Sequence, residues 1–159
     1  MDIFNSSPKN AMTFNHRGTP IDPELRPLWR ISLIALILFK ICSGNKANSK
    51  KIQVLYSLVA SEKKRRSYRL IIEKEELNLS VNVRFDPLVD RAVDIALGEE
   101  IFILDASKSI KLTEKGLGFV KKIDSDSSIF TLEKDFLKLF SKSHFSEKVI
   151  DSLITGGLS

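Results

Sequence analysis

The chain has 159 residues, of which 43% are hydrophobic and 28% are charged. These values are typical of a folded globular protein and argue against an intrinsically disordered chain. The length is enough for a hydrophobic core and indicates one domain or two very small ones. A net charge of +5 permits an acidic partner such as nucleic acid but does not require one. The single cysteine, Cys42, rules out a disulfide within the chain and is typical of a reducing cytoplasm.

The first 22 residues are polar, rich in turn-forming residues and without periodicity. We expect a flexible N-terminal arm over residues 1–22, although a frayed terminus is the commoner meaning of such a segment. Phe4 and Phe14 are isolated apolar side chains in this arm, and we expect them to contact a partner. Residues 23–123 are expected to form the main domain, and residues 124–159 a helical extension.

The main domain is predicted to begin with a helix over residues 23–42. Its apolar run ISLIALILF has nine residues and is bracketed by Arg30 and Lys40. A membrane-spanning helix needs about 20 apolar residues, so we expect a central core helix, with Cys42 in or near the core. A second helix is expected from Ser49, its N-cap, and a charged third helix over residues 61–76.

Residues 79–85 change the period of the pattern. Apolar and polar residues alternate strictly in the run LSVNVRF, which is typical of a strand with one buried face. Residues 101–104 and 110–112 are two further short β-prone runs, joined by a segment with the composition of a hairpin turn. We therefore expect a three-stranded antiparallel sheet made of these three runs.

The segment 85–123 has the strongest local signals. Asp86 is a natural helix N-cap and Pro87 suits the first helical position. Gly98 follows the apolar helix face as a stop signal, and Thr113 is the N-cap expected for the next helix. Gly116, inside that helix, is expected to let another backbone approach closely. Helix, β-ribbon and helix at this scale predict a winged-helix domain, so the fold class is α+β and mostly helical.

The extension is predicted to hold two short helices, opened by Thr131 and Ser146. An apolar face on the first of them is a candidate partner-binding surface, although such faces are more often core. Its candidate residues are Phe136, Leu137 and Phe140.

Nothing in the sequence has the spacing of a catalytic or metal site. The histidines, His16 and His144, are far apart, and no Cys/His pattern suits zinc. Asp90 and Asp94 share a helix face, but solvated charges are the commoner meaning of that pattern. We therefore predict no enzymatic activity, no metal, no cofactor, no small-molecule substrate and no membrane contact.

The strongest electrostatic feature is a basic run in the charged helix. Its candidate DNA-binding residues are Lys63, Lys64, Arg65, Arg66 and Arg69. Such a run can contact DNA phosphates without sequence preference. It can also be a solvated helix face, since nearby glutamates offer i,i+4 pairs, or a surface for an acidic protein. The helix before the predicted wing carries Asp90 and Asp94 and runs into two glutamates, so we expect it to face a protein rather than the DNA groove.

Four motifs in this order resemble a known family: DPELRPLWRISLIALIL, KKRRSYR, VRFDPLVDRAVDIALGEEIFIL and IKLTEKGLGFVKKI. They resemble the winged-helix middle component of three-component ABC systems, the bacterial anti-phage operons of the Lamassu type. The similarity covers residues 22–123.

The resemblance implies a non-catalytic accessory subunit in the cytoplasm. It would bind an SMC-like ABC ATPase and an effector subunit such as a nuclease, and meet double-stranded DNA mainly within that complex. The alternative is a free-standing winged-helix transcriptional regulator, which would bind a palindrome as a homodimer.

Overall fold

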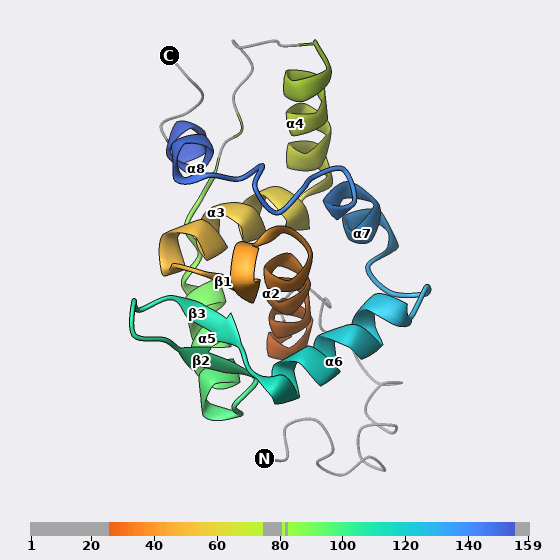
Figure 1. Cartoon of the computed structure of the whole chain (residues 1–159). Helices are drawn as coiled ribbons and strands as arrows, with labels where there is room; N and C mark the ends of the chain where they lie inside the picture. The colour runs from red at the N-terminus through yellow and green to blue at the C-terminus, as the bar shows by residue number, and fades with distance from the viewer. Residues whose placement is uncertain (1–25, 75–80, 82, 155–159) are drawn as a thin grey trace, which may run out of the picture.

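The structure, a computed structural model, describes residues 26–74, 81 and 83–154. The described elements in chain order are α2 (Pro27–Ile41), η2 (Ser43–Asn45), β1 (Lys46–Ala47), α3 (Ser49–Ala60), α4 (Glu62–Lys74), α5 (Pro87–Gly98), β2 (Phe102–Leu104), β3 (Ile110–Leu112), α6 (Glu114–Ser125), α7 (Thr131–Leu137) and α8 (Glu147–Ile154). Helices dominate and one small antiparallel sheet accompanies them (Figure 1). The prediction of an α+β, mostly helical chain is therefore confirmed.

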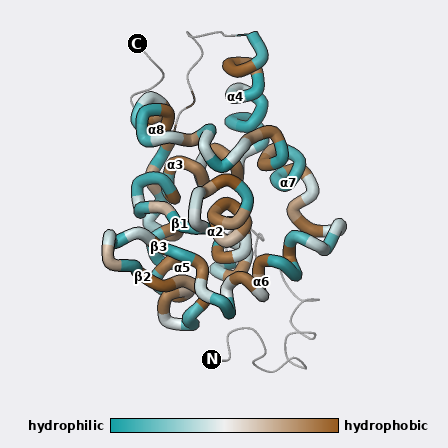
Figure 2. The backbone as a smooth tube through the Cα atoms, in the orientation of Figure 1, coloured by the Kyte–Doolittle hydropathy of each residue, from teal (hydrophilic) through white to brown (hydrophobic). Residues whose placement is uncertain are grey.

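Helix α2 lies at the centre and is covered by the other elements (Figure 1). It contacts α3, α5, α6, α7 and the sheet, and its run from Ile31 to Leu38 is buried. In Figure 2 the hydrophobic part of the tube is concentrated on this helix and on the inner sides of its neighbours. The predicted core helix is confirmed, and Cys42 at its end is fully buried. In the described part of the chain, no helix has the length and apolar character needed to span a bilayer.

The sheet corrects one prediction. Its order is β1-β3-β2, with Ala47 opposite Ile110 and Ile103 opposite Lys111. The hairpin of β2 and β3 was predicted, but the third strand is β1 and not the run 79–85. Within that run the described residues Val81 and 83–85 form no strand, and the other three lie outside the described residues.

The backbone before α5 is held by side chains of α3 in place of a strand partner. The Arg84 N–H donates to Ser57 Oγ at 3.4 Å, and the Asp86 N–H donates to Gln53 Oε1 at 2.9 Å. Alternation alone does not make a strand unless another strand accepts these backbone hydrogen bonds. The segment therefore runs extended along α3 into the first turn of α5.

Several predicted helix ends are confirmed. Asp86 Oδ1 accepts from the Leu88 N–H and Thr113 Oγ1 from the Gly116 N–H, each at 2.9 Å. The cap of α3 was predicted one residue late, since Asn48 and not Ser49 accepts from the Lys51 N–H. Helix α5 ends at Gly98 as predicted, but the left-handed residue beyond it is Glu100.

Gly116 has the predicted role. A Cβ atom built on it would collide with the carbonyl oxygen of Ile101, whereas one on Gly118 would meet open space. The absence of a side chain at Gly116 therefore lets the start of α6 pack directly on the backbone that leads into β2.

The C-terminal helices are part of the same core. Helices α7 and α8 both contact α3, and their buried residues belong to the hydrophobic cluster that contains α2. Thr131 begins α7 as predicted, with Phe130 before it in the left-handed region at a φ of 52°. Ser146 opens α8, where its Oγ accepts from the Val149 N–H at 3.3 Å.

Candidate functional site

The basic run lies on α4, and the helix divides it between two faces. Arg65 is only 6% exposed; its Nη1 donates to the Val59 carbonyl oxygen at 2.6 Å and lies 4.0 Å from Glu133 Oε2. Arg69 is half-buried, with its guanidinium carbon 5.6 Å from the centre of the Phe136 ring. The prediction of Arg65 as a DNA-binding residue is therefore wrong for this fold, because its guanidinium is buried and is already hydrogen-bonded within the protein.

Lys63 and Arg66 are the exposed members of the run. Arg66 Nη2 pairs with Glu62 Oε1 at 3.0 Å in an exposed i,i+4 contact. Exposed pairs of this kind contribute little stability and exchange readily with other partners. Both cations are thus available to an anionic surface.

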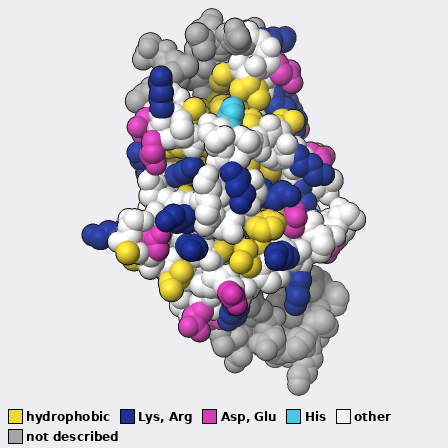
Figure 3. Space-filling model, in the orientation of Figure 1, with side chains coloured by type: hydrophobic (Ala, Val, Ile, Leu, Met, Phe, Trp, Pro, Cys, Tyr) yellow, Lys and Arg dark blue, Asp and Glu magenta, His cyan; other side chains and the backbone are white. Residues whose placement is uncertain are grey.

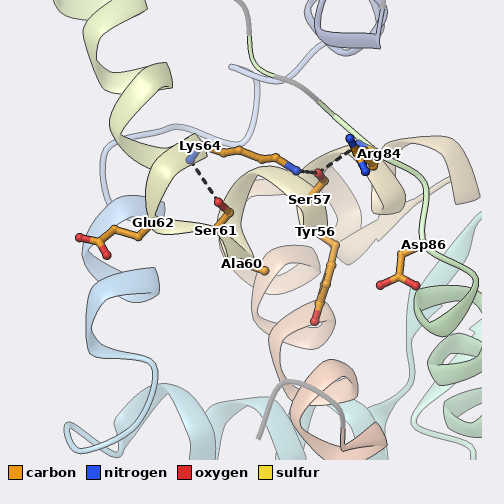
Figure 4. A pocket seen from close by; sticks show the side chains of 8 residues that line it. All are labelled: Tyr56, Ser57, Ala60, Ser61, Glu62, Lys64, Arg84 and Asp86. Carbon is orange, nitrogen blue, oxygen red and sulfur yellow. Dashed lines mark hydrogen bonds between the residues drawn. The ribbon is translucent and has the colours of Figure 1, made fainter. Parts of the chain in front are cut away.

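Lys64, between them in sequence, points into a pocket of about 450 Å³. The end of α3, the start of α4 and the segment before α5 form its walls, as Figure 4 shows. The lining residues are Tyr56, Ser57, Ala60, Ser61, Glu62, Lys64, Arg84 and Asp86. This volume lies within the usual range of ligand pockets.

Lys64 and Arg84 approach Ser57 from opposite sides of the pocket (Figure 4). Lys64 Nζ donates to Ser57 Oγ at 2.8 Å, and the same oxygen accepts from the Arg84 backbone N–H at 3.4 Å. Burial lowers the pKa of the Lys64 amine, and the positive charge of Arg84 lowers it further. The pocket therefore brings two cations close enough to repel each other.

The two carboxylates of the pocket are engaged elsewhere. Glu62 pairs with Arg66 and extends away from Lys64 in Figure 4, while Asp86 accepts from the Leu88 N–H as the cap of α5. Within the part of the chain that the structure describes, no ion pair reaches Lys64 or Arg84. Lys64 and Arg84 therefore line the pocket without a direct ionic partner among the described residues.

Sequence reasoning found Lys64 but missed the rest of this pocket. Ser57 is one serine in an apolar helix, and Arg84 was assigned to the polar side of a strand. The two residues are 27 positions apart, and only the packing of the segment before α5 on α3 brings them together. No local pattern in the sequence could have shown this.

The predicted partner surface on the extension is instead interior. Phe136 is 0% exposed, and Leu137 and Phe140 are also buried. They pack with α4, where Tyr68 lies 6.4 Å from Phe136 and 5.7 Å from Phe140, measured between ring centroids. The prediction that these three residues face a partner is corrected, because α4 already covers them. Phe4 and Phe14, the other predicted contacts, lie outside the described residues.

A hydrogen bond closes this aromatic cluster at its edge. The Tyr68 hydroxyl and His144 Nε2 are 2.8 Å apart, and Tyr68 stacks on Phe145 at 5.7 Å. Burial raises the pKa of Tyr68 to about 12 and lowers the pKa of His144. Both rings are therefore neutral near pH 7, as suits two side chains that hold α4 against the extension.

Helix α5 presents charge of mixed sign, with two acidic side chains and one basic side chain. Asp90, Arg91 and Asp94 are exposed, and Asp90 Oδ1 accepts from Gln53 Nε2 at 2.9 Å. Strand β2, which contacts α5, leaves Ile103 and Leu104 each 53% exposed. The face drawn in Figure 3 likewise shows basic side chains interspersed with acidic ones rather than a continuous basic patch.

Among the described residues, no group of three or more His, Cys, Asp or Glu side chains is placed to hold a metal ion. Comparisons with protein-family models, with curated proteins and with solved structures gave no match for this chain.

Proposed function

We propose that this chain is a winged-helix, non-catalytic accessory subunit of an SMC-like ABC ATPase assembly in anti-phage or anti-plasmid defence. In that role it bridges the ATPase, an effector and DNA. The proposal begins with the family resemblance of residues 22–123 and is supported by the order of the elements and by the surface of α5 and β2.

The order of elements supports the winged-helix part. A winged helix runs helix, strand, helix, helix and hairpin, and α2, β1, α3, α5 and the β2–β3 hairpin follow that order. Strand β1 pairs with β3 and completes the small sheet, as the first strand of a winged helix does. Helix α4 is an addition between the second and third helices of the pattern.

The surface of α5 is the observation that carries the protein-binding part. In a DNA-reading winged helix the third helix enters the major groove. Here that position is taken by α5, whose exposed Asp90 and Asp94 would be repelled by phosphates. The half-exposed Ile103 and Leu104 on the adjoining strand add apolar surface, which favours a protein partner over a charged duplex.

A free-standing transcriptional regulator is the second candidate. The exposed cations of α4, Lys63 and Arg66, favour it because they can contact a DNA backbone. A regulator of this kind binds a palindrome as a homodimer, and substitutions on α5 alter its preferred sequence.

Co-expression with an SMC-like ATPase encoded beside this chain tests the proposal. We expect a stable complex that Ile103→Glu and Leu104→Glu weaken, because each substitution puts a charge into the apolar contact. Lys63→Glu is the matched control on the other surface and should leave the complex intact. If the chain does not bind the ATPase and instead binds one palindrome through base contacts from α5, it is a transcriptional regulator.

A further inference from the structure

The pocket between α3, α4 and the segment before α5 has unused hydrogen-bond donors. A lysine amine has three donors, and Lys64 gives one to Ser57. Ser57 Oγ accepts twice, from Lys64 and from the Arg84 backbone, so its own O–H remains free to donate. Ser61 Oγ accepts from the Lys64 N–H at 3.2 Å and likewise keeps its O–H.

Arg84 adds a guanidinium with five donors in a planar fork. Its side chain is exposed and lies at the pocket near Ser57 and Lys64 (Figure 4). In the described ranges, 26–74, 81 and 83–154, neither a carboxylate nor a carbonyl oxygen binds this guanidinium. The donors of this fork are therefore available to a ligand at the pocket.

We propose that this pocket is an oxyanion site that takes a phosphate group, held by Lys64, Arg84 and the hydroxyls of Ser57 and Ser61. All four residues line the same pocket and carry hydrogen-bond donors, and an ionised phosphate group offers mainly acceptors. Arginine matches phosphate with two parallel hydrogen bonds, and charge-assisted bonds of this kind are the strong ones. The site does not depend on the ATPase proposal, since it is built wholly within this chain.

The two cations that line the pocket also favour an anionic ligand. Two like charges that share a partly buried space repel each other, and burial adds a desolvation cost. An anion between Lys64 and Arg84 removes the repulsion, whereas a neutral ligand leaves it. The two carboxylates that line the pocket do not form an ion pair with either cation, since Glu62 pairs with Arg66 and Asp86 accepts from the Leu88 N–H.

The phosphate has two possible sources that share this chemistry. It is either a backbone phosphodiester of DNA or a phosphate group on a free small molecule. Lys63 and Arg66, exposed cations on other sides of the same helix, would add contacts to a DNA backbone but nothing for a small ligand.

The experiment measures the melting temperature of the full chain in inorganic phosphate and in chloride at equal ionic strength. We expect phosphate to stabilise the wild-type chain and to fail to stabilise Lys64→Gln and Arg84→Gln. Loss of one charge-assisted contact should weaken phosphate binding by about tenfold. Lys63→Gln and Arg91→Gln are the matched controls, since each removes an exposed cation that does not line the pocket.

The second arm measures the salt dependence of binding to a short duplex. If DNA supplies the phosphate, Lys64→Gln and Arg84→Gln should each lower the slope of log affinity against log salt by about 0.9. If a free ligand supplies it, the pocket variants lose phosphate stabilisation while the slope stays unchanged. Lys64→Gln also removes the hydrogen bond to Ser57 and could therefore disturb the fold. Arg84→Gln changes an exposed side chain, so a loss of binding in that variant does not come from misfolding.

Two results would overturn the proposal. One is phosphate stabilisation that is equal in the wild type, both pocket variants and both controls, which is nonspecific screening. The other is no stabilisation by phosphate together with an unchanged duplex salt slope in Arg84→Gln.

Discussion

Helix α4 has a closed face and an open side, and both carry basic residues. Those of the closed face are buried or half-buried, whereas most of those on the open side are exposed. On the closed face, Arg65 donates to the Val59 carbonyl oxygen of α3, Arg69 lies against the Phe136 ring of α7, and Tyr68 is hydrogen-bonded to His144 in the loop before α8. The other sides of the helix make up its open side, where Lys63 and Arg66 meet solvent and Lys64 reaches the pocket beside Arg84. Adjacent arginines in one basic run thus serve structure in one case and remain available for binding in the other.

The difference shows what decides the use of a charged side chain. Helical phase turns Arg65 toward Val59 and Arg66 toward solvent. A buried guanidinium must satisfy its donors inside the protein, whereas an exposed one keeps its water until a ligand arrives. The predictions below test this division, from the largest expected effect to the smallest.

Removing an aromatic side chain that supports the closed face should cause the largest loss of unfolding free energy. Phe136→Ala deletes a fully buried ring that Tyr68 and Arg69 contact, and such a change costs about 3–5 kcal/mol of unfolding free energy. Leu132→Ala on the same short helix, at a side chain 60% exposed, should change it by less than about 0.5 kcal/mol. Urea denaturation measures both, and equal effects would show that α7 does not support α4.

The neighbouring arginines give a direct comparison of the two faces. Arg65→Met removes the donor to the Val59 carbonyl, and leaving a buried acceptor unpaired should cost about 1–3 kcal/mol. Arg66→Met removes only an exposed pair with Glu62 and should change stability by at most about 0.5 kcal/mol. If the Arg66 variant were the less stable one, the assignment of faces would be reversed.

Some features of this fold could be predicted from the sequence and others could not. Local rules predicted the caps Asp86 and Thr113 and the close approach at Gly116, because each depends on neighbours within a few residues or on a property of glycine itself. Strand β1 was missed because two residues, Lys46 and Ala47, cannot show a period. It exists only through pairing with β3, more than 60 residues away.

The candidate site was predicted in part, for the same reason. Composition identified the basic run, but which of its cations are free depends on α7, whose apolar face was taken for a partner surface. The structure alone places Arg84 at the pocket, through the hydrogen bond from its backbone N–H to Ser57 Oγ. Contacts between distant segments, which leave no local pattern, therefore decide both the closed face and the pocket.

Acidification should loosen the closed face through His144. Burial holds the pKa of this imidazole below its ordinary value of 6.5, so the unfolded chain takes up the proton before the folded chain does. Stability contributed by neutral His144 is therefore complete above pH 6.5 and is lost as the pH falls through and below that value.

Thermal unfolding as a function of pH measures this effect. We expect the wild type to lose more stability than His144→Asn on acidification through this window. Parallel curves would mean that His144 keeps its ordinary pKa and that the bond to Tyr68 is not sensitive to protonation.

The central claim is that the pocket beside the open side of α4 binds a phosphate group through its two cations, Lys64 and Arg84. Nitrogen-detected NMR of the Lys64 amine, titrated with and without inorganic phosphate, tests it most directly. We predict that the pKa of Lys64 lies below its ordinary value of 10.5 in the free chain and rises when phosphate is added, while Lys63 is unaffected. A Lys64 pKa that phosphate leaves unchanged, or shifts equally with Lys63, would contradict the account.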